Sequence, residues 1–391
     1  MGVVTCIEDL RHLARRRLPR MFYDYVDTGS WTESTYRANR HDLAALRLRQ
    51  RVLVDIQHRN LRSAMLGEPV TMPVALAPTG LTGMLHADGE ILAAQAAEAF
   101  GVPFTLSTMS ICSIEDVASH TGRPFWFQLY MLRDRDFMAR LIERARAARC
   151  SALVLTVDLQ IMGQRHKDLK NGLSAPPRPT LANWLNLATR PAWCWRMLNT
   201  RRRSFGNIVG HAAGVTDTAS LAAWNARQFD PTLSWQDVAW VKQRWQGRLV
   251  LKGIMDVADA RLAAAAGVDA LIVSNHGGRQ LDGAPSSISV LADIVDAVGH
   301  QVEVHMDGGI TSGQDVLKAL ATGARGVYIG RAFLYGLAAR GRQGVLDSLA
   351  IIHKELDTTM ALCGITDVAA LDRSVLLRQG RLPAAAGPGP A

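Results

Sequence analysis

Short apolar runs recur at intervals along the chain from residue 73 onward. Eight of these runs contain three to six residues, are mostly apolar, and end at glycine or polar residues. Short apolar runs bounded by turn residues are typical of buried strands. The predicted strands cover residues 74–77, 104–107, 125–130, 153–157, 249–251, 270–273, 302–305 and 326–329.

A stretch with helical periodicity follows each of these runs. The predicted helices cover residues 89–100, 114–119, 136–148, 235–245, 257–266, 288–298, 314–321 and 333–339. Strands that alternate with helices favour a parallel sheet, and eight strand–helix units predict an α/β protein with the (β/α)8 TIM-barrel fold. The alternative is an open doubly wound sheet, but no GxGxxG motif follows the first strand.

The segments outside this repeat define the domain organisation that we expect. Residues 1–380 form one domain, in which residues 1–72 are an N-terminal, partly helical cap interrupted at Pro19. Residues 159–233 are too long for a simple loop and form an insertion after the fourth strand. A helical region at 345–362 closes the barrel. The Pro/Gly/Ala-rich segment 381–391 is predicted to be a disordered tail.

Residues with useful chemistry gather at all eight predicted strand ends. In a TIM barrel the carboxyl ends of the strands carry the active site. The residues found there are Pro78, Thr79, Gly80, Ser107, Met109, Gln128, Tyr130, Thr156, Asp158, Lys252, Ser274, His276, Arg279, Asp307, Gly308, Gly309, Gly330 and Arg331.

The sequence SNHGGRQ at 274–280 places an imidazole and a guanidinium three residues apart. His276 can take a proton near neutral pH. Arg279 can hold a carboxylate through two parallel hydrogen bonds. The pair therefore indicates chemistry next to a carboxylic acid. Taken alone, the same residues also fit a polar loop with a solvated arginine.

The last two strand ends and Lys252 indicate anion binding. The sequence DGGITS at 307–312 leads into a helix, and Gly330–Arg331 precedes another, so backbone N–H groups, helix dipoles and Arg331 form a phosphate site. Turn glycines with an N-cap at Ser312 are the alternative. Lys252 ends an apolar strand and is either a Schiff-base lysine or a charge that stabilises a reduced, anionic cofactor.

Composition and charge restrict the class of protein. The 391 residues are 48% apolar and 20% charged, which is typical of a globular chain. The net charge of +9 favours an anionic partner, but no motif supports nucleic acid. The five cysteines show no metal-binding spacing and favour a reducing, cytoplasmic environment. We expect no secretory signal, no membrane span and no metal site.

The insertion contains an unusual basic segment. Residues 169–216 hold seven Lys or Arg residues, no Asp or Glu, and several tryptophans and leucines. This composition is typical of a segment at a membrane surface, so a peripheral position on the inner face of the plasma membrane is one interpretation. A solvated basic loop over the barrel is the other. Its prolines and glycines predict that much of the segment is not helical.

Taken together, these motifs resemble the FMN-dependent L-2-hydroxy acid dehydrogenase/oxidase family. The resemblance spans about residues 5–375, and SNHGGRQLDG at 274–283 is its most specific part. The supporting motifs are FQLY at 127–130, TVD at 156–158, VLKGI at 250–254, DGGI at 307–310 and GRAFLYGLAA at 330–339. The bacterial respiratory L-lactate dehydrogenases are the most similar branch, followed by the mandelate dehydrogenases.

The resemblance implies an FMN site and a role for each residue. FMN would contact Pro78, Thr79, Gly80, Ser107, Gln128, Thr156, Lys252, Ser274, Asp307, Gly308, Gly309, Gly330 and Arg331. Substrate would contact Tyr25, Tyr130, Arg165 and Arg279, with Met109 in the side-chain pocket. His276 would be the base, and Asp158 would stabilise its imidazolium. Lys252 would stabilise the reduced flavin.

The implied reaction is oxidation of an L-2-hydroxy acid, L-lactate first, to the 2-oxo acid. Electrons would pass to a quinone or a cytochrome, and the protein would be a homotetramer. The alternatives are a mandelate-type dehydrogenase, a soluble oxidase that produces hydrogen peroxide, an FMN barrel isomerase acting on a phosphorylated substrate, and a non-catalytic flavin-binding protein.

Two positions depart from the family pattern. The family commonly has arginine where this chain has Thr311, which predicts weaker FMN binding unless the hydroxyls of Thr311 and Ser312 compensate. Gly80 stands where alanine is frequent, a position that affects oxygen access, so the choice between dehydrogenase and oxidase stays open.

Overall fold

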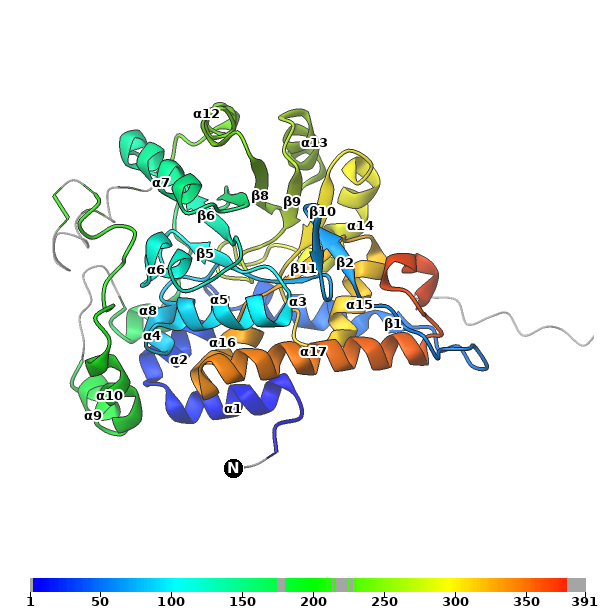
Figure 1. The fold of residues 1–391 in the computed structure, drawn as a ribbon, viewed down its shortest axis with the longest axis horizontal. Helices are drawn as coiled ribbons and strands as arrows, with labels where there is room; N and C mark the ends of the chain where they lie inside the picture. Colours follow the sequence, from blue (N-terminus) through cyan, green and yellow to red (C-terminus); the bar gives the residue numbers. More distant parts are fainter. Residues whose placement is uncertain are drawn as a thin grey trace, which may run out of the picture.

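The fold is taken from a computed structural model that describes residues 3–173, 180–212, 214–215, 224, 228 and 230–377. The expected tail at 381–391 lies outside these residues. The central sheet has eight strands (Figure 1). They are β4 (Val74–Leu76), β5 (Thr105–Ser107), β6 (Trp126–Tyr130), β7 (Ala152–Thr156), β8 (Arg248–Ile254), β9 (Ala270–Val273), β10 (Glu303–Met306) and β11 (Gly326–Ile329).

The eight strands form a closed parallel barrel. Their order is β4-β11-β10-β9-β8-β7-β6-β5, and every neighbouring pair is parallel. A parallel bridge between Leu76 and Phe104 joins the two ends of this order. The predicted TIM barrel is therefore confirmed, and the doubly wound alternative is wrong.

The helices that follow the strands surround the barrel (Figure 1). They are α5 (Gly89–Phe100), α6 (Ile114–Ala118), α7 (Arg135–Ala147), α12 (Trp235–Trp245), α13 (Val257–Ala265), α14 (Ser287–Val298), α15 (Gly313–Thr322) and α16 (Arg331–Arg340). A short α4 (Thr82–Leu85) precedes α5, and α17 (Arg342–Leu362) packs along α16. Side-chain caps at Ser113, Asp134 and Ser286 help to set where α6, α7 and α14 begin.

Alternate residues of the strands serve two different cores. Ala152 and Val154 of β7 point into the barrel with Trp126 and Tyr328. Leu153 and Leu155 belong to the larger core beneath the helices. Because both faces of each strand are buried, the strands are apolar throughout, and this explains why they read as continuous apolar runs.

The N-terminal segment covers one side of the barrel. It contains α1 (Ile7–Arg17), α2 (Arg20–Val26) and α3 (Ser34–Ala45), with Pro19 as the N-cap residue of α2. Helix α1 packs on α16, and α3 packs on α14 and α15. Three smaller elements follow as β1 (Arg47–Leu48) and the hairpin of β2 (Ser63–Met65) and β3 (Glu68–Val70). Strand β1 pairs with β12 (Leu376–Leu377), after the turns η1 (Val368–Ala370) and η2 (Arg373–Val375).

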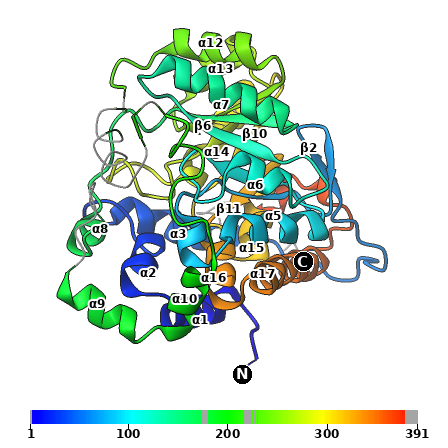
Figure 2. The ribbon, with the colours of Figure 1, turned by 60° about the vertical axis from the view of Figure 1, so that its left-hand side comes forward.

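The insertion after β7 is more helical than expected. It contains α8 (His166–Lys170), α9 (Leu181–Ala188) and α10 (Pro191–Asn199), which lie beside α1 and α2 (Figure 2). Trp193 stacks on Phe22 at 5.3 Å between ring centroids and donates a hydrogen bond to the carbonyl of Met84. Proline at the start of α10 is compatible with a helix because the first turn needs no donor there. In the described part of the chain, no helix is long and apolar enough to span a membrane.

Candidate active site

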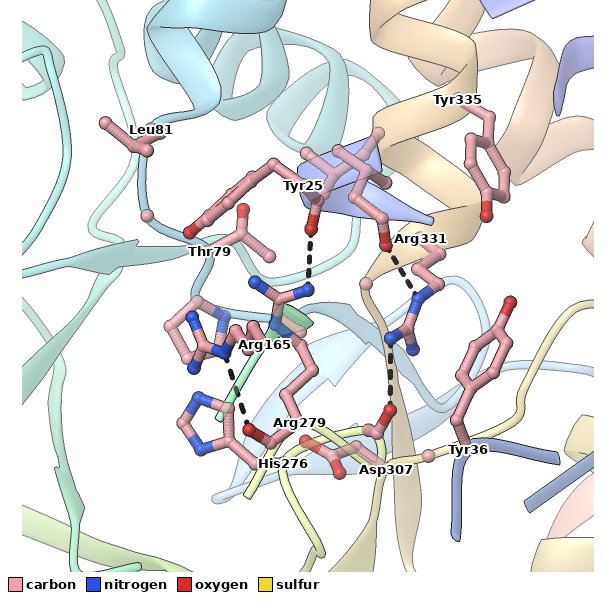
Figure 3. A pocket seen from close by; sticks show the side chains of 18 of the residues that line it. Tyr25, Tyr36, Thr79, Leu81, Arg165, His276, Arg279, Asp307, Arg331 and Tyr335 are labelled. Atoms are coloured by element: carbon pink, nitrogen blue, oxygen red, sulfur yellow. Dashed lines mark hydrogen bonds between the residues drawn. The ribbon is translucent and has the colours of Figure 1, made fainter. Parts of the chain in front are cut away.

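A cavity of about 1080 Å³ lies at the carboxyl ends of the strands, between the barrel, the N-terminal helices and the insertion. Fifteen of the predicted site residues line it (Figure 3). They are Tyr25, Pro78, Thr79, Gly80, Met109, Tyr130, Arg165, Lys252, His276, Arg279, Asp307, Gly308, Gly309, Gly330 and Arg331. The other five, Ser107, Gln128, Thr156, Asp158 and Ser274, lie behind its wall and hydrogen-bond to one another or to residues that line it.

His276 and Asp158 form a hydrogen-bonded pair at the cavity wall. Nδ1 of His276 lies 3.0 Å and 3.1 Å from the two carboxylate oxygens of Asp158. Because the carboxylate can only accept, Nδ1 carries the proton in neutral imidazole and Nε2 keeps its lone pair. Burial lowers the pKa of His276 below 6.5, against the opposing pull of Asp158. Neutral imidazole with a free Nε2 is the form that a general base requires.

Asp158 is held in its charged form. Burial raises its pKa, but the interaction with His276, including the Nδ1 hydrogen bond, and the charge of Lys252 outweigh burial, so the pKa falls below 3.8. An ionised Asp158 would stabilise an imidazolium at position 276.

The backbone around His276 is shaped by contacts with α3. His276 has a φ of 57°, and its N–H donates to Oγ of Ser274. Gly278 has a φ of 73°, and a Cβ there would lie 2.5 Å from the backbone of Tyr36. The side chains of Asn275 and Asn39 exchange hydrogen bonds of 2.8 Å and 2.9 Å. Glycine is therefore required at 278, and α3 fixes the turn that aims the imidazole.

Two guanidinium groups face the same end of the cavity as His276 (Figure 3). Nη1 of Arg279 donates to the carbonyls of Tyr25 and Thr28, and the guanidinium lies 4.7 Å over the Tyr25 ring. Nη2 is buried and has no hydrogen-bond partner among the described residues. Burial and the charge of Arg279 lower the pKa of Arg165 to about 10, which still leaves it charged at neutral pH. Two neighbouring guanidinium groups, one with a buried N–H donor that has no partner, can bind the carboxylate of a ligand.

Tyr130 completes this end of the cavity. Burial and the charge of Asp158 raise the pKa of its phenol above 10. The hydroxyl therefore stays protonated and can donate a hydrogen bond to a substrate oxygen.

Sequence reasoning missed Asp168 of α8 at this end. Its carboxylate lies 3.9 Å from Nη2 of Arg279, and burial raises its pKa. The only signal in the sequence was that Asp168 immediately precedes residues 169–216, which contain no Asp or Glu. Tyr36 and Phe205 also line the cavity, but their helix and loop are brought there by tertiary packing alone.

A row of hydrogen bonds joins the ends of adjacent strands. Ser107 of β5 donates to Gln128 of β6 at 3.0 Å, and Gln128 donates to Thr156 of β7 at 3.0 Å. The ammonium of Lys252 on β8 donates to Ser274 at 2.8 Å and pairs with Asp307 at 3.0 Å. Burial lowers the pKa of Lys252, but Asp307 and Asp158 raise it further, so the net pKa lies above 10.5. The buried lysine therefore remains charged.

A family model for FMN-dependent dehydrogenases matches residues 14–378 of this chain. The chain belongs to the FMN-dependent dehydrogenase family. This assignment confirms the resemblance inferred from the motifs and identifies FMN as the cofactor.

Individual relatives of this FMN-dependent dehydrogenase cover nearly the whole chain. An L-lactate dehydrogenase from Caulobacter sp. (strain K31) is 44% identical over 380 residues, which cover 97% of this chain and 100% of the relative. An L-lactate dehydrogenase from Azorhizobium caulinodans is 45% identical over 376 residues, covering 96% and 99%. The crystal structure of (S)-mandelate dehydrogenase, described as a monotopic membrane protein, has a TM-score of 0.92 at 36% identity and covers 96% of this chain and 100% of that chain.

The far end of the cavity fits a phosphate-bearing cofactor. Oδ1 of Asp307 is buried without a hydrogen-bond partner among the described residues, so it can accept from a cofactor hydroxyl. Helix α16 has Gly330 as its N-cap residue and therefore no side chain that caps its first N–H groups. Gly330 and Arg331 line the cavity, so the positive end of the helix dipole is available to an anion.

Two of the residues expected to bind the phosphate also make hydrogen bonds within the protein. The guanidinium of Arg331 donates to the carbonyls of Val26, Thr28 and Gly277 and lies 4.5 Å over the Tyr36 ring. These bonds connect the N-terminal segment to the His276 turn. The hydroxyl and the N–H of Thr311 both donate to Asp315, so the compensation considered for Thr311 is not available while those bonds hold.

Proposed function

We propose that this FMN-dependent dehydrogenase oxidises L-lactate to the corresponding 2-oxo acid. The observation that carries the proposal is the His276–Asp158 pair in one cavity with Arg165 and the unused donor of Arg279. The names of the curated relatives support L-lactate as the first substrate to test. The mandelate dehydrogenase structure supports a larger L-2-hydroxy acid as the second candidate.

The substrate carboxylate would bind to Arg279 and Arg165. Nη2 of Arg279 is already directed and desolvated, so a carboxylate gains a charge-assisted hydrogen bond without further ordering of that side chain. The protonated phenol of Tyr130 would donate to the substrate, and Tyr25 lies close enough to Arg279 to close the same pocket. Met109 lines the cavity and would contact the substrate side chain.

His276 would remove a proton from the bound hydroxy acid through Nε2. The positive charge that develops on the ring is stabilised by Asp158 across the Nδ1 hydrogen bond. When bound, FMN supplies the two-electron oxidant for the substrate. Lys252 contributes a fixed positive charge to the cavity wall, which favours a cofactor that becomes more negative on reduction.

The residues proposed to hold FMN fall into three groups. Pro78, Thr79 and Gly80 contribute from the end of β4, and Asp307 to Gly309, Gly330 and Arg331 contribute from the ends of β10 and β11. The third group is the hydrogen-bonded row at the cavity wall, which consists of Ser107, Gln128, Thr156, Lys252 and Ser274.

Anaerobic reduction of the purified yellow protein tests the proposal. Addition of L-lactate should bleach the flavin absorbance, and a panel of L-2-hydroxy acids ranks the substrates by rate. A protein that keeps its oxidised spectrum with every acid of the panel is not a hydroxy acid dehydrogenase. A non-catalytic flavin protein would behave identically before and after replacement of His276 by Ala.

We also propose that electrons pass to a quinone at a membrane surface, with a cytochrome as the alternative acceptor. Helices α9 and α10, which lie within segment 169–216, carry large apolar side chains exposed at helical spacing. They are Leu181 (76%), Trp184 (61%), Leu185 (65%), Trp195 (68%) and Leu198 (71%). Basic residues, including Arg196 and Arg201, flank them. An apolar face with adjacent cations is typical of interfacial helices, and the mandelate dehydrogenase with the TM-score of 0.92 is described as monotopic.

Sedimentation with anionic lipid vesicles tests this surface. Replacing Trp184 and Leu185 together by Ser should weaken vesicle binding at least about tenfold because two large apolar side chains are lost. Leu262→Ser on α13 is the matched control, since Leu262 is also exposed but lies on another side of the barrel. If the parent, the Trp184/Leu185 double variant and Leu262→Ser bind vesicles equally well, the basic segment is a solvated loop and not a membrane-binding surface.

A soluble oxidase is the second candidate function because mandelate oxidase is among the similar structures, at a TM-score of 0.82 and 37% identity. Hydrogen peroxide formed at the full turnover rate in air would favour the oxidase. Faster reduction of a quinone analogue or of cytochrome c than of oxygen would favour the dehydrogenase.

A cytoplasmic homotetramer is a further proposal. The family resemblance supports the oligomer, and the five free cysteines support a reducing compartment. Analytical ultracentrifugation measures the oligomer, and a monomer at micromolar concentration contradicts this part of the proposal. Cell fractionation tests the location.

A further inference from the structure

Seven cationic side chains line the cavity in the described part of the chain. They are Arg11, Arg40, Arg165, Arg203, Lys252, Arg279 and Arg331. Six of them hydrogen-bond to the protein itself. The side chain of Arg40 makes no hydrogen bond, ion pair or ring contact with any residue that the structure describes.

Arg40 lies next to the glycine turn that follows β10. It is on α3, directly after Asn39. A Cβ at Gly309 would lie 2.5 Å from the carbonyl oxygen of Asn39, and one at Gly308 would lie 3.3 Å from its side-chain oxygen. The two glycines thus let α3 approach the turn, and this approach brings Arg40 to the cavity with Gly308, Gly309 and Thr311.

Several other polar groups at this end already have partners within the protein. Arg11 pairs with Glu8 and Asp27. The first amide of α15, that of Gly313, donates to Glu355. Arg331 uses its Nε and Nη2 on three backbone carbonyls, and Thr311 is held by Asp315. Among the described cations that line the cavity, Arg40 has none of its side-chain donors engaged by the protein.

We propose that Arg40 binds the phosphate of FMN and supplies the charge that position 311 lacks. A side chain that is solvent-exposed and unpaired in the protein can reach an anion without breaking an existing bond. The guanidinium fork matches two phosphate oxygens. The inference depends on FMN as the cofactor and does not depend on the identity of the hydroxy acid.

Flavin affinity of the full-length protein tests the proposal. Dilution of the yellow holoprotein releases FMN, whose fluorescence gives the dissociation constant. Arg40→Met should weaken FMN binding by about 10- to 100-fold, the usual effect of one charge-assisted hydrogen bond. Arg40→Lys should lose less because it keeps the charge. Full-length protein stripped of flavin and reloaded with riboflavin, which lacks the phosphate, should bind equally well with or without Arg40.

Arg37→Met is the matched control. Arg37 lies one turn earlier on the same helix, is also exposed, and does not line the cavity. It should change FMN affinity less than about twofold, the scale of an ordinary surface substitution. Equal FMN affinity of Arg40→Met and the parent would overturn the proposal. So would equal losses for FMN and riboflavin, or an equal loss in Arg37→Met. Arg40→Met could weaken FMN binding but not riboflavin binding in a protein whose flavin no hydroxy acid reduces. That result would support this inference and reject the proposed function.

Discussion

The two ends of the cavity contain similar residues that the protein engages to different degrees. At the His276 end, Arg279 keeps one buried donor unused, and Asp158 is committed to the imidazole. At the glycine end, Arg331 donates to three carbonyls, and Asp315 and Glu355 occupy amides at the start of α15. At both ends the protein therefore engages part of an arginine and leaves the remaining amino group, Nη2 of Arg279 and Nη1 of Arg331, without a hydrogen-bond partner among the described residues.

The largest effect should come from the group proposed to move the proton. His276→Asn keeps a polar side chain but removes the base, so anaerobic flavin reduction by L-lactate should slow by about 10²- to 10⁴-fold. Stopped-flow absorbance measures the rate. The yellow colour should remain, because the residues proposed to hold FMN are unchanged. A rate within a factor of two of the parent would remove His276 from the mechanism.

Arg331→Met should reduce stability more than it changes substrate binding. It leaves the carbonyls of Val26, Thr28 and Gly277 without their charged donor, which should cost about 3 kcal/mol of unfolding free energy. Urea denaturation of the holoprotein measures this loss. Unchanged stability would show that these three bonds do not hold the N-terminal segment to the His276 turn.

Arg279→Lys should show the opposite behaviour. Lysine keeps the charge but loses the planar fork, so KM for the hydroxy acid should rise by about tenfold or more, while FMN affinity changes less. Steady-state kinetics with a dye acceptor gives KM, and flavin release gives the affinity. If KM does not change, Arg279 does not contact the substrate, and the contrast between the two arginines fails.

The smallest predicted effect is the pH dependence. His276 must be neutral to accept a proton, and burial lowers its pKa below 6.5. The value of kcat/KM should therefore be constant above pH 6.5 and fall only at lower pH, as the imidazole becomes protonated. Asp158→Asn removes the negative charge that raises the pKa of His276, so the decrease in kcat/KM should move to still lower pH. The value of kcat/KM at high pH should also drop, because the charge that stabilises the imidazolium is lost. A decrease in kcat/KM that already begins above pH 6.5 would contradict the role of His276 as the base.

Local sequence determined the barrel and much of the candidate site. The apolar runs are strands because both of their faces are buried, and glycine or polar residues end them at the carboxyl edge of the sheet. Parallel strands bring all their carboxyl ends to one rim, so His276, Asp158 and Lys252 could be placed together before their distances were known. The motif at 274–283 then indicated the family.

Tertiary packing decided which of these side chains are free to bind a ligand. Arg40 is more than 260 residues away from Gly309 in the sequence, yet α3 places them at one cavity. Likewise, the partners of Arg331 come from α2, the following loop and the His276 turn, which no spacing pattern connects. The sequence alone determined which residue types stand at each strand end. Only the folded chain determined their hydrogen-bond partners, because those depend on how the N-terminal helices and the insertion pack over the barrel.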